Sequence, residues 1–78
     1  MSKDNNLDPY ESLANAIVLQ AVKDYRVALK RLKKHPNNKD AAIERDSIER
    51  FFRSGYFGIL TDIDPEYLID RLNEEVFG

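Results

Sequence analysis

The stretch that decides the fold is Asp8–Lys34, DPYESLANAIVLQAVKDYRVALKRLKK, in a chain of 78 residues. Asp8 can accept from the free N–H groups of a first helical turn, and Pro9 fits the first helical position, where a missing N–H costs nothing. Apolar residues then recur every three or four positions, at Leu13, Ile17, Ala21, Tyr25, Ala28 and Leu32. This is the helical period. Further apolar residues widen the stripe: Ala14, Val18, Val22 and Leu29.

The length of this helix sets the architecture. At 1.5 Å per residue it should span about 40 Å, whereas a compact domain of this size has a radius of gyration of about 12 Å. We therefore expect later helices to fold back along it and another chain to cover part of its apolar stripe.

A second helix is predicted from Lys39 to Arg53, beginning at a cap from Asn37 or Asn38. Pro36 ends the first helix, and the short connection implies an antiparallel hairpin. The apolar face of the second helix comprises Ala41, Ile48, Phe51 and Phe52, with Ile43 to one side.

The C-terminal third of the chain repeats this helix-start chemistry. Ser54 can cap one extra turn, and Asp64 followed by Pro65 starts a third helix that should end near Val76. Its inward residues should be Leu68, Ile69, Leu72 and Val76. The predicted fold is all-α: a long helix and a second helix in an antiparallel hairpin, a short turn, and a third packed C-terminal helix. Residues 1–7 should be a frayed N-terminus, and residues 8–78 a single helical domain.

Composition limits the class of protein. The chain has no cysteine, which removes disulfides and thiol chemistry and fits a reducing compartment. Residues 1–6 lack the apolar core of a signal peptide, and no stretch approaches the roughly 20 apolar residues of a membrane span. We expect a cytoplasmic protein that makes no membrane contact.

The net charge of −2 conceals a strong asymmetry. Residues 23–53 hold ten Lys or Arg against five Asp or Glu, whereas residues 54–78 hold one basic residue against six acidic ones. The basic middle and the acidic tail could meet within one molecule or across a dimer.

A basic stripe on the first helix is the first candidate site. Its members are spaced three and four apart and share a helix face: Lys23, Arg26, Lys30 and Lys34. They could contact the phosphates of nucleic acid. The competing interpretation is a solvated face whose cations suit the C-terminal end of the helix dipole.

A partner interface is the second candidate site. It would combine the uncovered apolar stripe at Leu29 with Arg53, Tyr56 and Phe57, because cations and aromatic residues are common at interaction hot spots. The competing interpretation is that Tyr56 and Phe57 form a corner of the core.

Metal binding and catalysis are not predicted. Asp62, Asp64 and Glu66 alternate like oxygen ligands, but the EF-hand pattern fails and capping accounts for Asp64. His35, the single histidine, has no partner at the spacing of a catalytic triad, and no Gly-rich phosphate loop is present. We expect no cofactor and no enzymatic activity.

Several segments resemble a group of small uncharacterised proteins encoded in phages and integrative elements of Gram-positive bacteria. The resemblance rests on Phe51-Phe52-Arg53-Ser54 through Thr61-Asp62-Ile63-Asp64, on Tyr67-Leu68-Ile69, and on Asp24-Tyr25 and Pro36-Asn37-Asn38. It implies a cytoplasmic accessory protein of a mobile element and carries over no site residues. Gly55 departs from the acidic residue more usual after that Ser, which weakens the prediction of an extra turn.

The function we expect is therefore a small non-enzymatic interaction module that binds a protein partner or itself, with a homodimer plausible. The alternative is a nucleic-acid-binding accessory protein that uses the basic stripe. Salt separates them, because phosphate contacts weaken steeply as salt rises, whereas an apolar interface responds little.

Overall fold

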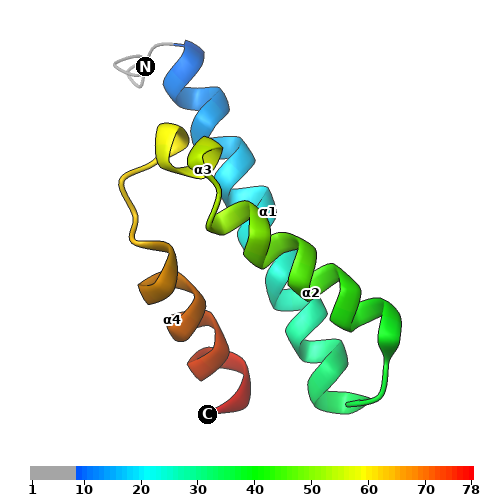
Figure 1. Cartoon of the computed structure of the whole chain (residues 1–78). Helices are drawn as coiled ribbons and strands as arrows, with labels where there is room; N and C mark the ends of the chain where they lie inside the picture. The colour runs from blue at the N-terminus through cyan, green and yellow to red at the C-terminus, as the bar shows by residue number, and fades with distance from the viewer. Residues whose placement is uncertain (1–8) are drawn as a thin grey trace, which may run out of the picture.

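The structure, a computed structural model, describes residues 9–78 and is all-α over that range, as predicted. The helices are α1 (Pro9–Lys34), α2 (Lys39–Phe52), α3 (Gly55–Leu60) and α4 (Pro65–Phe77). Figure 1 shows α2 running back along α1 as an antiparallel hairpin, with α4 on another side of α1. No strand occurs among residues 9–78.

Side-chain caps begin three of the helices, as the sequence predicts. Asn38 Oδ1 accepts from Ala41 N at 3.0 Å, and Asp64 Oδ1 accepts from Glu66 N at 3.1 Å. Ser54 Oγ accepts from Phe57 N, in α3, at 3.2 Å. The predicted cap at Asp8 and the frayed residues 1–7 lie outside the described residues.

The segment after Ser54 forms more helix than predicted. One turn was expected, with Gly55 weakening it, yet α3 extends over six residues. Phe57 and Leu60 on this helix are buried, so their packing on the core supports a short helix that its own sequence would not sustain.

Four large side chains fill the centre of the core: Tyr25, Leu29, Phe52 and Phe57. The ring of Phe52 lies edge-on to Tyr25 and to Phe57, at centroid distances of 5.4 Å and 5.3 Å. Such edge-to-face pairs add to the stabilisation from apolar burial. They join α1, α2 and α3 at one point, and α4 closes the core with Ile69, Leu72 and Val76.

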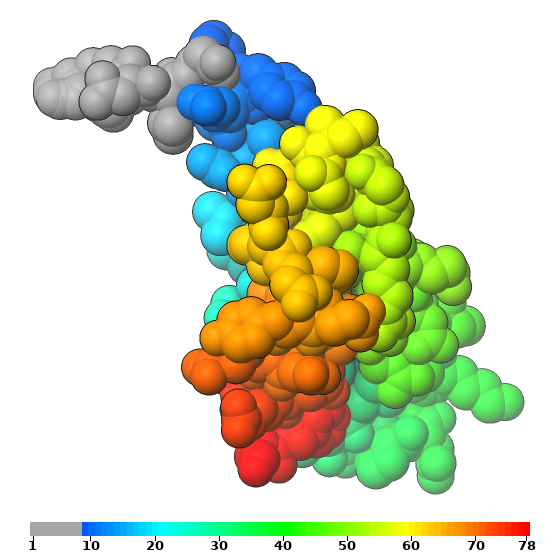
Figure 2. Space-filling view, turned by 60° about the vertical axis from the view of Figure 1, so that its left-hand side comes forward, coloured from blue at the N-terminus to red at the C-terminus, as the bar shows by residue number. Residues whose placement is uncertain are grey.

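The molecule is elongated, with extents of 45 × 27 × 21 Å and a radius of gyration of 14.3 Å. In Figure 2 the first turns of α1, in blue, lie at one end of the molecule, beyond α4. The first buried residue of α1 is Ala14, and Leu13 is 59% exposed although it belongs to the predicted apolar stripe. The later helices thus fold back as expected, and the first turns of α1 stay largely uncovered.

None of the described helices has the length and apolar character that crossing a membrane requires.

Candidate functional site

The four residues predicted for a partner interface do not share a surface. Leu29 and Phe57 are each 1% exposed and lie in the core, so neither can contact a partner while the fold is intact. The prediction was wrong for these two, because Leu29 belongs to the core cluster and Phe57 packs from α3 against Phe52. Tyr56 is 53% exposed and does face solvent.

Arg53 is held by α4. Its Nε and Nη2 donate to the two carboxylate oxygens of Glu66 at 2.6 Å and 3.0 Å, and its Nη1 lies 3.5 Å from Glu49 Oε1. The hydrogen bonds to Arg53 lower the pKa of Glu66, and the same contact raises the pKa of the guanidinium. This pair fastens the start of α4 to the end of α2.

The basic stripe is partly covered by the acidic helix. Lys23, Lys30 and Lys34 are exposed. Arg26, in contrast, donates from Nε and Nη2 to the carboxylate of Glu75 at 2.7 Å and 3.1 Å. These hydrogen bonds lower the pKa of Glu75. The basic middle and the acidic tail therefore meet within one molecule at this contact.

Two of the three acidic residues considered as metal ligands have structural roles. Asp64 caps α4 and Glu66 binds Arg53. Within the part of the chain that the structure describes, no three acidic or histidine side chains are grouped to hold a metal ion. His35 is exposed at the end of α1, where its backbone N–H donates to Arg31 O at 2.8 Å.

The feature that sequence reasoning missed is a groove along the seam between α1 and α2. Its first half is open, has a volume of about 370 Å³, and has an apolar floor of Ile17, Ala21, Ile48 and Phe51. Its rim carries Gln20, Asp24 and Ser47. The floor side chains are all partly or fully buried in the isolated chain, but their outer surfaces form the base of this opening.

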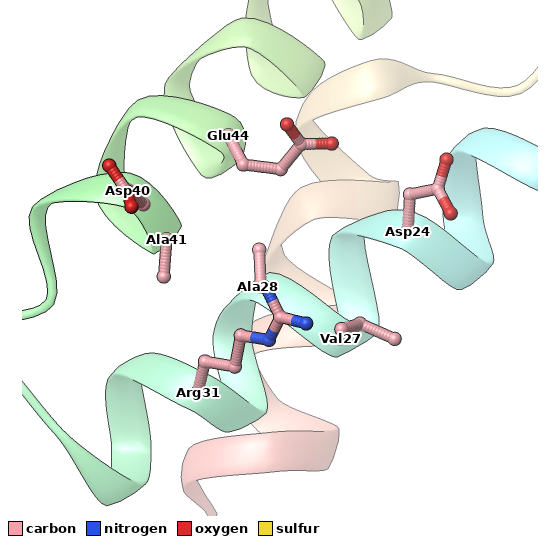
Figure 3. A pocket seen from close by; sticks show the side chains of 7 residues that line it. All are labelled: Asp24, Val27, Ala28, Arg31, Asp40, Ala41 and Glu44. Carbon is pink, nitrogen blue, oxygen red and sulfur yellow. The ribbon is translucent and has the colours of Figure 1, made fainter.

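The second half of the groove, with a volume of about 330 Å³, is acidic (Figure 3). Ala28 and Ala41 form its floor, and their small side chains leave the opening between the helices. The rim carries Asp24 and Arg31 from α1, with Asp40 and Glu44 from α2. Val27 completes the lining and is half-exposed.

The two halves form one groove, because Asp24 lines both. On α1 the lining positions run from 17 to 31 in steps of one or three residues, which keeps them on one helix face. Two of the α1 residues that bind α4, Arg26 and Lys33, lie two positions from the lining residues Asp24 and Arg31, respectively. At 100° per residue they project from nearly the opposite side of α1. The groove and α4 thus occupy different sides of the hairpin.

Two exposed apolar side chains lie near the apolar end of the groove. Leu13 lies one turn before Ile17 on the same face of α1. The ring of Tyr56 packs edge-on to Phe51, with centroids 6.1 Å apart. The predicted interface residue Tyr56 therefore borders the groove. The sequence signal that could have revealed the other groove residues is the row of apolar positions on α1, flanked by polar residues, between Leu13 and Asp24.

Comparisons with known proteins return no matching family model, no matching curated protein and no matching solved structure.

Proposed function

We propose that this chain is a non-enzymatic interaction module that binds a helical segment, of a protein partner or of a second copy, in the groove between α1 and α2. The observation that carries the proposal is the continuous unpartnered face of the hairpin, with Leu13 and Tyr56 exposed beside an apolar floor. An apolar surface of this kind gains free energy when water is removed from it.

The packing of helices supports the same choice. Two antiparallel helices leave a seam into which the side chains of a third helix can fit. Along α1 the helix α4 already packs in this way, with Ile69, Leu72 and Val76 in the core. A helix laid along the other side would complete a bundle, which is a common mode of peptide recognition.

Site-specific photocrosslinking in the native host tests the proposal. Leu13 and Leu19 make a matched pair, because both are leucines of α1 and both are 59% exposed. Leu13 adjoins the groove, whereas Leu19 projects from a different side of the helix. We expect a photoreactive residue at position 13 to give a discrete adduct, with another protein or with a second copy, and one at position 19 to give none. Equal adducts, or none at position 13, would contradict the proposal.

Nucleic-acid binding is the second candidate, and the three exposed lysines Lys23, Lys30 and Lys34 favour it. It ranks second because Arg26 is engaged by Glu75 and Lys33 donates to Val76 O at 2.9 Å. A binding titration with a mixed-sequence DNA duplex decides it, since phosphate contacts must weaken steeply as salt rises.

The resemblance to small proteins of Gram-positive phages and integrative elements supports one further part of the proposal. It favours a cytoplasmic accessory protein of a mobile element, and an interaction module of this size suits that role.

A further inference from the structure

We infer that the occupant of the groove is an amphipathic helix of another protein, apolar at one end and rich in Lys or Arg at the other. This inference rests on the proposed function, since it specifies what the groove between α1 and α2 binds. It is carried by the unequal charge of the two halves of the groove.

The acidic half carries three carboxylates, from Asp24, Asp40 and Glu44, against the single cation of Arg31. Among residues 9–78, Asp40 and Glu44 form no ion pair, and Asp24 accepts only from the neutral amide of Gln20, at 2.9 Å. Figure 3 shows these side chains placed around the opening on both helices. Three carboxylates gathered around one opening attract a cationic partner.

The acidic half of the groove lies in the most basic part of the chain. It lies within residues 23–53, the part of the chain with ten basic residues against five acidic ones. Three of those five acidic residues line the groove. The exposed cations of α1, such as Lys23 and Lys30, are not among the residues that line the groove. The second half of the groove is thus an acidic opening within a basic region, and it would attract the basic end of a partner segment.

The apolar half selects for a different chemistry. Its floor consists of Ile17, Ala21, Ile48 and Phe51, and apart from Asp24 at the junction its rim is neutral. A cation placed here would lose hydration without gaining a partner. The matching residues of the occupant should therefore be apolar at this end and basic near the loop that joins α1 to α2.

The length of the groove fits one helix. From Ile17 to Arg31 the lining advances fourteen positions, or about 21 Å at 1.5 Å per residue. A helix of about four turns spans that distance. Its apolar positions at intervals of three and four would follow the seam between the two helices.

A second copy of this chain fits the full groove poorly. A two-fold dimer places the same surface on both subunits. If the grooves run parallel, the carboxylates of Asp24, Asp40 and Glu44 face their own copies. If they run antiparallel, each set faces the apolar half of the partner. Both arrangements bury uncompensated charge, so a partner with the complementary pattern is favoured.

Three designed helical peptides of eighteen residues test the inference by fluorescence anisotropy. All carry the same Leu and Ile stripe in one half, and the other half presents Lys, Gln or Glu at the groove-facing positions. We expect the Lys peptide to bind at least about threefold more tightly than the Gln peptide at low salt, and the Glu peptide more weakly still. The advantage of Lys should disappear at high salt.

Two variants of matched charge locate the effect. The Asp40→Asn/Glu44→Gln variant should abolish the preference for Lys, whereas the Asp62→Asn/Asp70→Asn variant, altered at exposed acids outside the groove, should keep it. If the preference survives in the first variant or falls equally in both, the inference is wrong.

Three further outcomes show whether this inference fails alone or together with the proposed function. If all three peptides bind equally and Leu13→Glu abolishes binding, the groove is a docking site without charge selection, so the function stands and the inference fails. If no peptide binds and a salt-resistant dimer dissociates in Leu13→Glu, the occupant is a second copy. If no peptide binds and position 13 gives no adduct, both fail.

Discussion

Tyr25 is the residue that joins three helices through one polar atom. Its hydroxyl donates to Glu49 Oε2 on α2 at 2.6 Å and accepts from Asn73 Nδ2 on α4 at 2.9 Å, while its side chain is fully buried. Replacing it by Phe leaves both partners without this contact. We expect Tyr25→Phe to lower the free energy of unfolding by about 1–3 kcal/mol near neutral pH, measured by chemical denaturation.

The same hydroxyl predicts a loss of stability at high pH. Burial, followed by the hydrogen bond to Glu49, raises the pKa of Tyr25 above its ordinary value of 10.0. Above pH 10.0 the unfolded chain therefore releases this proton while the folded chain keeps it, which favours unfolding. The advantage of the native protein over Tyr25→Phe should shrink by up to about 1.4 kcal/mol per pH unit above that point. If the difference in free energy of unfolding between the two proteins stays constant as the pH rises above 10.0, the prediction is wrong.

Leu29 and Leu13 lie on the same helix, but Leu29 is in the core and Leu13 is on the surface. Leu29→Ala should lower the free energy of unfolding by about 2–5 kcal/mol, because it opens a cavity in the packed core. Leu13→Ala should change it by less than about 0.5 kcal/mol, because that side chain is mostly exposed. Thermal or urea denaturation of both variants measures the contrast. Similar values for the two would mean that the core is placed incorrectly.

At the scale of the element, α3 is short and contains two glycines within six residues. An added Cβ at Gly58 meets no atom within 4 Å, and this residue has no positive φ. We expect Gly58→Ala to stabilise the protein by about 0.4–1 kcal/mol, because it reduces the entropy of the unfolded chain. Gly78→Ala is the control: its φ of 81° disfavours alanine, so it should give no gain. A melting experiment in which both variants behave alike would contradict this.

The helix α4 also covers one member of the basic stripe. Because Glu75 engages both nitrogens of Arg26, Glu75→Gln should free this cation for phosphate. Glu74→Gln removes the same charge one residue away, where no ion pair is formed in the described structure. If the stripe binds DNA, Glu75→Gln should strengthen binding at low salt and steepen the salt dependence by about one contact, more than Glu74→Gln does. Equal effects would show only a change in net charge.

At the scale of the whole molecule, the sequence predicts whatever is set by local chemistry. The caps at Asn38, Ser54 and Asp64 depend on neighbouring residues, so the helix starts were correct. Which apolar residues of α1 are buried depends on where α3 and α4 pack against it, and the apolar periodicity of α1 does not specify that position. Leu29 and Leu13 therefore look equivalent in the sequence, although one is in the core and the other is exposed.

The groove was missed for the same reason. Its lining comes from two helices, and most of its positions are polar or small, such as Asp24, Ala28 and Ala41. Such residues on an isolated helix predict a solvated face. They define an opening only after the antiparallel pairing of α1 and α2 brings them together.

The elongated shape predicts an uneven distribution of stability along α1. Before Ala14 no residue of the described helix is buried, whereas Tyr25, Ala28, Leu29 and Leu32 anchor its C-terminal half. Local opening costs least where few apolar contacts must be broken. We therefore expect backbone amides of residues 13–16 to exchange with deuterium much faster than those of residues 26–32, measured by mass spectrometry or NMR.

Binding should change this pattern in a defined way. A helix seated in the groove would cover Leu13 and Ile17 at the apolar end, and so protect the early turns of α1 most. Protection confined to Lys23, Lys30 and Lys34 on the outer face would instead indicate a ligand on the basic stripe. Uniform exchange along α1 in the free protein would show that its first turns are held by contacts other than those described. The exchange profile thus shows which face of α1 a ligand covers.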